Sequence, residues 1–177
     1  PELLTSLISQ PRPDEITGSQ KIFNVLFVCT GNSTRSIFAE AILKAEGGGK
    51  FRAFSAGTRP RATLKPLASE VLRAKGHEIS QFYPKSYDAF YEVSAPRMDF
   101  VFTVCDRAAN EECPPLLGQP VTAHWGMTDP SRTEGTEAER ALAFKQCYAT
   151  MERRLKAFTS LPFSSLSKIS LQQELDF

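Results

Sequence analysis

The sequence predicts an α/β domain built on a parallel sheet with helices on both faces. The first observation is that four short apolar runs alternate with stretches whose apolar residues recur at helical spacing. The second is that the first run is nearly continuous rather than alternating, which is typical of a strand buried on both faces. The third is composition: a chain of 177 residues with 41% hydrophobic residues suffices for one domain with a full core.

The first half of the domain is predicted as strand, helix, strand and helix. Residues 23–28 form an apolar run, and the helical stripe that follows it, which includes Ile37 and Ala41, stops at three consecutive glycines. Residues 51–55 are the second predicted strand. A second helix is expected at 65–75, where a glycine closes it.

The second half adds two strands and a long helix. Residues 99–104, DFVFTV, are the third predicted strand, and residues 120–125, PVTAHW, are the fourth. The long helix is expected from about 134 to 158, because Phe144, Tyr148 and other apolar residues fall on one of its faces. No internal repeat is present.

We expect the domain to cover residues 22–160, between an N-terminal extension at 1–21 and a serine-rich C-terminal tail at 161–177 for which the pattern predicts no element. The formal net charge of +1 draws the chain neither to nucleic acid nor to a membrane surface. No apolar run approaches the roughly 18 residues of a membrane span. The opening residues lack a signal-peptide layout, so a cytoplasmic protein with reduced thiols is expected.

Residues 29–36, CTGNSTRS, occupy the turn between the first strand and the first helix. In a parallel α/β sheet, ligands bind beyond the carboxyl ends of strands, and a helix start adds positive potential. Gly31 can adopt positive φ and Asn32 tolerates the left-handed region, so successive N–H groups can curl into an anion nest. Arg35 adds a planar fork that grips two oxygens. The predicted oxyanion site consists of Thr30, Gly31, Asn32, Ser33, Thr34, Arg35 and Ser36.

Cys29, at the base of this loop, is the predicted nucleophile. The helix start and Arg35 both favour its thiolate, and such sites lower a thiol pKa from about 8.5 to about 3.5–7.5. A thiolate that faces a bound oxyanion is an activated nucleophile. The alternative is a cysteine that merely packs as a small hydrophobic residue. The preceding strand, the following helix, Gly31, Asn32 and Ser36 all agree with the catalytic interpretation.

The segment CTGNSTRS resembles the anion loop of the low-molecular-weight tyrosine phosphatase superfamily, and within it the chain is most similar to the arsenate reductases. The similarity runs from about residue 23 to residue 158, and the segments FSAGTRP, DFVFTVCDRAANEECP and TAHWGMTDP also carry it. The resemblance implies a flavodoxin-like fold with a four-stranded parallel sheet. It also implies that Cys29 and Arg35 are catalytic and that Ser36 hydrogen-bonds the sulfur of Cys29.

The resemblance assigns the general acid to Asp129, which precedes Pro130 after the fourth strand. Proline fixes the local geometry, and the residue before it is biased to extended conformations. The phosphatases of this superfamily usually follow the pair with an aromatic residue that lines the phosphotyrosine pocket, whereas Ser131 stands here. This difference argues against a phosphatase.

Cys105 and Cys113 follow the third strand, on the same sheet edge as Cys29 if the strands are parallel. In the reductases a thiolate attacks As(V), a second thiol attacks the resulting sulfur, and As(III) leaves; the second step is ordinary thiol exchange. Cys105 and Cys113 are therefore candidate resolving thiols, although Cys105 is also compatible with a core cysteine. Cys113 stands in a polar loop, where burial is a poor explanation.

The electron donor stays open at this point. Cys105 and Cys113 are spaced one residue further apart than is typical of the thioredoxin-coupled branch, and Thr34 stands where that branch often has a second loop cysteine. A sister branch takes electrons from glutathione and glutaredoxin. The resemblance thus implies thioredoxin or glutathione with glutaredoxin as reductant, and no bound cofactor.

By their offset from the nucleophile, Asn32, Glu40 and Ser55 match a potassium site of some of the reductases, but a solvated helix carboxylate is the favoured interpretation of Glu40. No other metal is expected, because no cysteine pair has C-x2-C spacing. His77 is predicted as a surface loop residue and His124 as a packed support.

Two further features are predicted to lie outside the chemistry. The basic loop with Arg59, Arg61 and Lys65 could rim the anion site, but a solvated surface loop is the favoured interpretation. Cys147, within the long helix, is expected to serve packing alone.

The leading hypothesis is an arsenate reductase that works through a covalent Cys29–arsenic intermediate. The nearest alternative is a low-molecular-weight protein tyrosine phosphatase, a phosphomonoester hydrolase that uses the same Cys29, Arg35 and Asp129. A third alternative is a non-catalytic oxyanion-binding sensor. The intact set of nucleophile and acid argues against the sensor, because binding alone needs only the loop and Arg35.

Overall fold

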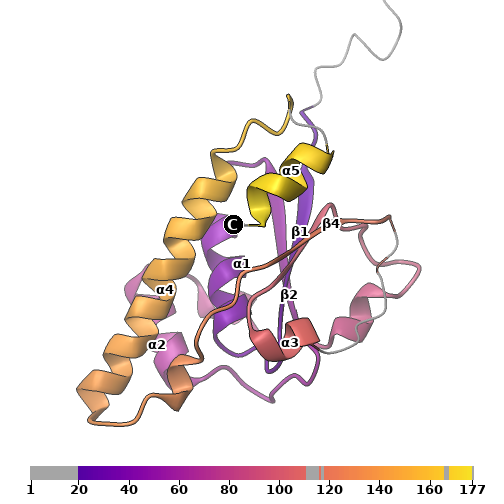
Figure 1. Cartoon of the computed structure of the whole chain (residues 1–177). Coiled ribbons are helices and arrows are strands. Elements are labelled where there is room, and N and C mark those ends of the chain that lie inside the picture. The colour runs from indigo at the N-terminus through magenta and orange to yellow at the C-terminus, as the bar shows by residue number, and fades with distance from the viewer. Residues whose placement is uncertain (1–19, 111–115, 117, 166–167, 177) are drawn as a thin grey trace, which may run out of the picture.

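The described part of the chain forms a four-stranded, wholly parallel sheet in the order β2-β1-β3-β4 (Figure 1). The computed structural model describes residues 20–110, 116, 118–165 and 168–176. The strands are β1 (Phe23–Cys29), β2 (Phe51–Gly57), β3 (Phe100–Thr103) and β4 (Val121–His124). The helices are α1 (Arg35–Glu46), α2 (Pro66–Ala74), α3 (Asp106–Asn110), α4 (Glu137–Thr159) and α5 (Lys168–Leu175). Short 3-10 turns are η2 (Ile79–Gln81), η3 (Tyr87–Phe90) and η4 (Pro130–Arg132).

The core lies mainly between the sheet and the helices α1 and α4, which pack against each other on one face (Figure 1). Phe27 of β1 stacks on Phe102 of β3 with 5.5 Å between ring centroids, and Phe158 of α4 meets Phe102 at 5.2 Å. On the other face, η3 and α3 lie near Val28 and Val101. The predicted fold class, with helices on both faces of a parallel sheet, is confirmed.

The parallel arrangement brings the carboxyl ends of all four strands to one edge. In the register of the sheet, Cys29 pairs with Gly57 and Val28 pairs with Thr103. The loops that follow the four strands therefore begin side by side. Such an edge is where ligands bind in open α/β sheets.

Element boundaries differ from the predicted ones where local chemistry intervenes. Helix α4 begins later than predicted because Gly135 has φ +127° and Thr136 forms a capping box with Glu139. Strands β3 and β4 are each one residue shorter at both ends than predicted. Single backbone hydrogen bonds still join residues beside these strands to the neighbouring strand. For example, the Trp125 N–H donates to the Thr103 carbonyl at 2.7 Å.

The tail contains an element that the pattern does not predict. Helix α5 packs beside the edge strand β4, with Leu171 and Leu175 buried and the Gln172 amide donating to the Thr122 carbonyl at 2.5 Å. Covering an edge strand in this way blocks pairing with another chain. The domain boundaries at 22–160 stay a prediction, and residues 1–19 lie outside the described residues. Of the helices described, none is long and apolar enough to cross a membrane.

Candidate functional site

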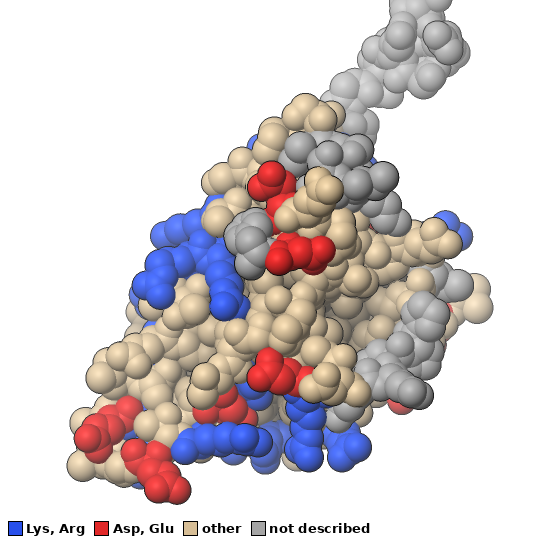
Figure 2. Space-filling model, viewed as in Figure 1, with Lys and Arg blue, Asp and Glu red and all other residues tan. Residues whose placement is uncertain are grey.

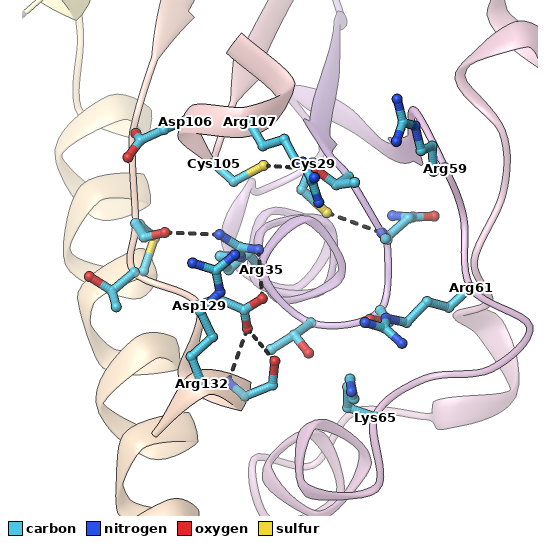
Figure 3. Close-up of a pocket in the computed structure, with 18 residues that line it drawn as sticks. Cys29, Arg35, Arg59, Arg61, Lys65, Cys105, Asp106, Arg107, Asp129 and Arg132 are labelled. Carbon is cyan, nitrogen blue, oxygen red and sulfur yellow. Dashed lines mark hydrogen bonds and ion pairs between the residues drawn. The ribbon is translucent and has the colours of Figure 1, made fainter. Parts of the chain in front are cut away.

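Cys29 lies at the floor of a pocket at the carboxyl edge of the sheet, where β1 ends (Figure 3). Its side chain is 2% exposed. The backbone N–H of Asn32 donates a hydrogen bond to Cys29 Sγ at 3.1 Å, and Ser36 Oγ lies 2.9 Å from the sulfur. The predicted contact between Ser36 and the sulfur is therefore confirmed, and the loop curls around the nucleophile.

Asn32 holds the loop in this shape. Its φ of +46° confirms the left-handed conformation predicted for it. Its amide nitrogen donates to Ser36 Oγ at 2.8 Å and to Ser55 Oγ at 2.9 Å, while its amide oxygen accepts from the Lys85 N–H at 2.8 Å. These bonds tie the loop to β2 and to the segment before η3. Each polar atom of this buried side chain thus has a partner.

The glycines serve the loop differently from the prediction. Gly31 does not have positive φ, so that expectation is wrong. A side chain there would instead press on Arg61, whose Nε lies 3.3 Å from the position of a Cβ. The tighter constraint is at Gly57, where a Cβ would lie 2.6 Å from the Thr30 carbonyl oxygen and 3.0 Å from the Asn32 Cβ. The end of β2 must therefore be glycine for the anion loop to lie beside it.

Burial controls the protonation of the nucleophile. It raises the pKa of the Cys29 thiol above its ordinary value, and hydrogen bonds from Ser36 and the charge of Arg35 oppose it only in part. The lowered pKa predicted from the sequence is therefore wrong. The sequence indicates which charges are near the sulfur but not how completely the protein encloses it.

Arg35 points from the start of α1 into the same pocket (Figure 3). Its Nη1 donates to the Met127 carbonyl at 3.0 Å, and its Nη2 forms an ion pair with Asp129 Oδ2 at 3.2 Å. The side chain is 13% exposed. The structure therefore brings the predicted anion-gripping arginine and the predicted acid into direct contact.

Asp129 is oriented by the residue that departs from the phosphatase pattern. The Ser131 N–H and hydroxyl both donate to Asp129 Oδ1, at 3.0 and 2.7 Å. Burial alone would raise the pKa of Asp129, but the Ser131 hydrogen bonds and the nearby charges of Arg35 and Arg132 lower it overall. Sequence analysis considered Ser131 only as the absence of an aromatic residue and missed this role.

Cys105 lies beside Cys29 in the same pocket (Figure 3). It is buried, Thr30 Oγ1 lies 3.5 Å from its sulfur, and the Ala108 N–H at the start of α3 donates to that sulfur at 3.4 Å. The two thiols are close enough for charge on Cys105 to affect the pKa of Cys29. The other candidate resolving thiol, Cys113, lies outside the described residues.

His124 and Asp106 form a surface pair next to Cys105. His124 Nε2 lies 3.0 Å from Asp106 Oδ1, and His124 Nδ1 lies 2.8 Å from Thr103 Oγ1. The His124 side chain is 42% exposed, so the prediction of a packed support is wrong. A Cβ at Gly126 would lie 2.6 Å from Asp106 Oδ1 and 2.8 Å from His124 Nε2, so a side chain there would displace these two side-chain tips.

Glu40 is buried at 3% exposure, so the interpretation as a solvated carboxylate is wrong. It accepts from Ser55 Oγ at 2.5 Å and forms an ion pair with Lys44 at 2.6 Å. The ammonium group of Lys85 lies 3.4 Å from Glu40 Oε2 and 3.2 Å from Ser55 Oγ. The three residues matched to a potassium site, including Asn32, are thus together, with a lysine cation among them.

The pocket, of about 740 Å³, is lined with cations. Besides Arg35 and the anion loop, its lining includes Arg59, Arg61, Lys65, Arg107 and Arg132. The basic loop between β2 and α2 therefore rims the site, and its interpretation as merely solvated is wrong. The loop reaches the site because the Arg61 N–H donates to the Gly31 carbonyl at 2.9 Å.

Two residues outside the pocket complete the comparison with the predictions. His77 is half-buried, and its Nε2 lies 2.7 Å from the Tyr148 hydroxyl, so the prediction of a plain surface loop residue is wrong. Cys147 is buried on α4, as predicted, and burial raises its pKa to about 12. A thiol with so high a pKa stays protonated at neutral pH.

Comparison with known proteins agrees with this site. Residues 24–173 match the family model described as low molecular weight phosphotyrosine protein phosphatase. An arsenate reductase of Bacillus licheniformis is 34% identical over 134 residues, which cover 76% of this chain and 93% of that protein.

Two solved structures share the fold. The arsenate reductase of Archaeoglobus fulgidus matches with a TM-score of 0.61 at 23% identity, over 77% of this chain and 99% of that chain. A thioredoxin-dependent arsenate reductase of Corynebacterium glutamicum matches with a TM-score of 0.54 at 23% identity, over 81% of this chain and 64% of that chain. With the family model and the Bacillus relative, the chain belongs to the low-molecular-weight phosphotyrosine protein phosphatase family, in the group that contains the arsenate reductases.

Proposed function

We propose that the protein is an arsenate reductase, which reduces arsenate to arsenite through a covalent Cys29–arsenic intermediate that a second thiol resolves. The observation that carries this proposal is the second thiol itself: Cys105 lines the same pocket as Cys29. A phosphatase needs one nucleophile and an acid, and has no use for a thiol at this position. A reductase needs one, because electrons must reach arsenic from sulfur.

Substrate binding prepares the acid. Arg35 pairs with Asp129 at 3.2 Å, so an oxyanion that enters the loop takes over the guanidinium from the carboxylate. Asp129 then loses a neighbouring positive charge and gains a neighbouring negative one, and both changes raise its pKa. Binding therefore favours uptake of the proton that Asp129 must donate to the departing oxygen. Ser131 keeps the carboxyl oriented meanwhile.

The chemistry then takes two steps. The Cys29 thiol gives its proton to an arsenate oxygen and the resulting thiolate attacks arsenic, while an arsenate hydroxyl takes the proton of Asp129 and leaves as water. Cys105 next attacks the sulfur of Cys29, and the sulfur–arsenic bond breaks with its electron pair left on arsenic. As(V) becomes As(III), and the two thiols become a disulfide, so the electrons balance.

A thiol reductant must reduce this disulfide back to two thiols before the next turnover. We propose thioredoxin or glutathione with glutaredoxin for this step, with Cys113 as the thiol that passes the disulfide to the surface. The need for reduced Cys29 and Cys105 before each turnover favours a reducing compartment, and we propose the cytoplasm. No bound cofactor enters these steps.

Lys85 supports the loop in place of a bound cation in this proposal. Its ammonium group lies among the oxygens of Glu40, Ser55 and the Tyr83 carbonyl, at 3.4, 3.2 and 3.0 Å. A potassium ion would need the same oxygens. We therefore expect no stimulation of turnover by potassium, and a response to potassium in Lys85→Met.

Phosphomonoester hydrolysis by Cys29, Arg35 and Asp129 is the second candidate. The paired Arg35 and Asp129 favour it as much as they favour reduction. Against it, none of the described residues that line the pocket is aromatic, so an aryl phosphate would find no ring to stack on.

One experiment separates the candidates. Purified protein is assayed with arsenate, with thioredoxin or glutaredoxin regeneration in parallel, and with p-nitrophenyl phosphate. We expect donor-dependent arsenite formation and much slower phosphate release. Efficient phosphate release without arsenite formation would reject the reductase.

A further inference from the structure

The side chain of His124 joins the two ends of the turn that carries Cys105. Its Nδ1 lies 2.8 Å from Thr103 Oγ1, and its Nε2 lies 3.0 Å from Asp106 Oδ1. Thr103 is the last residue of β3, and Asp106 is the first residue of α3. Cys105 therefore lies between the two residues that the ring contacts, and the ring itself comes from the end of another strand, β4.

Both of these hydrogen bonds form at once, whatever the charge of the ring. In a neutral ring with the proton on Nε2, Nε2–H donates to the Asp106 carboxylate and Nδ1 accepts from the Thr103 hydroxyl. In a protonated ring both nitrogens donate, and the Thr103 hydroxyl oxygen accepts. The bridge between Thr103 and Asp106 therefore exists in both protonation states of His124.

The bridge is anchored at β3 and β4 and exposed at α3. Thr103 and His124 are register partners in the pairing of β3 with β4, and the Trp125 N–H donates to the Thr103 carbonyl at 2.7 Å. Asp106 is 85% exposed, and at the place of α3 Figure 2 shows acidic and basic side chains next to each other on the surface. The link to Asp106 is thus the part of the bridge that solvent and salt weaken.

Helix α3 needs support from outside itself, because a helix of five residues is not stable on its own. The Ala108 N–H of this helix donates to Cys105 Sγ at 3.4 Å. Figure 3 shows that the Cys105 sulfur points toward Cys29, whereas the Asp106 carboxylate points the other way. A contact that holds Asp106 therefore fixes the direction of the Cys105 side chain without blocking its sulfur.

We propose that His124 is a positioning residue for the second chemical step: by tying Thr103 to Asp106, it keeps the Cys105 thiol facing the sulfur of Cys29. This inference rests on the proposed function, in which Cys105 attacks that sulfur. His124 does not line the pocket, so it acts through the turn rather than on a reacting atom. The first step should not depend on it, because the anion loop holds the nucleophile.

The formation of a Cys29–Cys105 disulfide reports this positioning without arsenate. In a glutathione redox buffer, one oxidised glutathione takes two electrons and two protons from the two thiols and becomes two reduced glutathione molecules, while the protein gains one S–S bond. The equilibrium constant rises with the effective concentration of one thiol at the other, so it falls when Cys105 is held less well. Cys113→Ser is the background, and mass spectrometry after acid quenching identifies the bond.

Loss of the ring should weaken both readouts. In His124→Ala, the equilibrium constant for the disulfide and the rate of arsenite release should each fall by about three- to fivefold, as expected for an exposed hydrogen-bonded pair. The rate at which the Cys29–arsenic adduct forms should stay the same. Thr103→Val removes the hydroxyl but keeps the shape of the side chain, and it should lower both readouts by a smaller factor. His77→Ala is the matched control, because His77 also contacts a hydroxyl, that of Tyr148, and does not line the pocket; it should change neither readout.

Substitutions of the aspartate separate positioning from a general effect on stability. Asp106→Ala should reproduce His124→Ala, and the combined variant should lose no more than either single variant, because the two side chains act as one pair. Asp106→Asn keeps an oxygen that accepts from Nε2–H, so it should retain most of the disulfide equilibrium constant. Urea unfolding of each variant checks that the fold persists.

Four results would overturn the inference: an unchanged disulfide equilibrium in His124→Ala, an equal slowing of adduct formation, a loss in the combined variant that is the product of the two single losses, or a loss in Asp106→Asn as large as in Asp106→Ala. Failure of the proposed function is a separate result. If the unaltered protein forms no arsenite, arsenate is rejected as substrate, whereas the disulfide equilibrium still decides whether His124 positions Cys105.

Discussion

The two thiols of the pocket are held in very different ways. Cys29 lies in a loop in which Asn32 bridges three other segments and in which the sulfur has two hydrogen-bond partners. Cys105 follows a strand of four residues and precedes a helix of five. Its sulfur also has two partners, Thr30 Oγ1 at 3.5 Å and the Ala108 N–H at 3.4 Å, but both contacts are longer than those of Cys29, and the neighbouring Asp106 and His124 form an exposed pair.

This difference fits the order of the chemistry. The nucleophile has to stay in one position while a bound oxyanion reacts with it. The resolving thiol has to give up its contact with Thr30 and form a bond to the sulfur of Cys29. A disulfide requires Cα atoms about 4.4–6.8 Å apart. Short, dense bonding around Cys29, and longer contacts at Cys105 beside an exposed His124–Asp106 pair, suit these two tasks. The following predictions test the contrast, from the largest effect to the smallest.

Replacement of the nucleophile should have the largest effect. Cys29→Ser should reduce arsenate turnover to background, because the loop curls around the sulfur of Cys29, which accepts a hydrogen bond from the Asn32 N–H. Phosphate or sulfate binding should persist, since the loop and Arg35 remain. Turnover and isothermal titration with phosphate measure the two properties. Arsenate turnover close to that of the unaltered protein would exclude Cys29 as nucleophile.

Replacement of the resolving thiol should stop cycling after arsenate has reacted. In Cys105→Ser the Cys29–arsenic adduct should form but should not release arsenite with thioredoxin. Mass spectrometry detects the adduct, and arsenite quantification detects its release. Cys113→Ser should also stop thioredoxin-driven cycling, but only after one arsenite is released. Full activity of the combined Cys105→Ser and Cys113→Ser variant with every donor would exclude both cysteines from electron transfer.

Removal of the acid should lower the rate of arsenate reduction less than removal of either thiol, because the thiols that carry the electrons remain. Asp129→Asn should slow arsenate reduction by about 10²–10⁴-fold, the usual effect of a positioned general acid. The high-pH fall of the rate should disappear with the carboxyl, while the rise with pH that reflects deprotonation of Cys29 should stay. Rate profiles from pH 5 to pH 10 provide the measurement. An unchanged kcat at every pH would show that a group other than Asp129 is the general acid.

The anion loop around Cys29 should depend on Asn32 for its stability. Asn32→Ala removes three side-chain hydrogen bonds and places alanine at φ +46°, so unfolding should become easier by about 3 kcal/mol. Urea unfolding followed by circular dichroism measures the change. A loss below about 0.5 kcal/mol would mean that the loop does not rely on this bridge.

The region around Cys105 should tolerate the loss of a hydrogen-bonding side chain better than the anion loop does. His124→Ala removes an exposed pair, so the unfolding free energy should change by less than about 1 kcal/mol. The rate of adduct formation at Cys29 should stay the same, while the rate of arsenite release should shift a few-fold. Rapid-quench measurement of both steps separates them. An equal effect on both steps would contradict the division of labour between the two sides.

Much of the fold and the centre of the site follow from the sequence alone. The parallel sheet, the anion loop and Arg35 could be predicted because each depends on residues that are neighbours along the chain, whereas the assignment of Asp129 depends on the family resemblance of the segment that contains it. The left-handed φ of Asn32 is likewise a property of its own residue type and turn. The sequence is sufficient to predict a feature where interactions between residues close along the chain determine its conformation.

Only the tertiary structure decided which distant residues complete that site. The raised pKa of Cys29, the approach of Lys85 to Glu40, and the arrival of Arg61 at the pocket all depend on segments brought together by the sheet. Burial and charge at one atom are sums over everything packed around it. Helix α5 escaped prediction for the same reason, because its pattern is weak and its docking on β4 supplies the stability that its sequence does not.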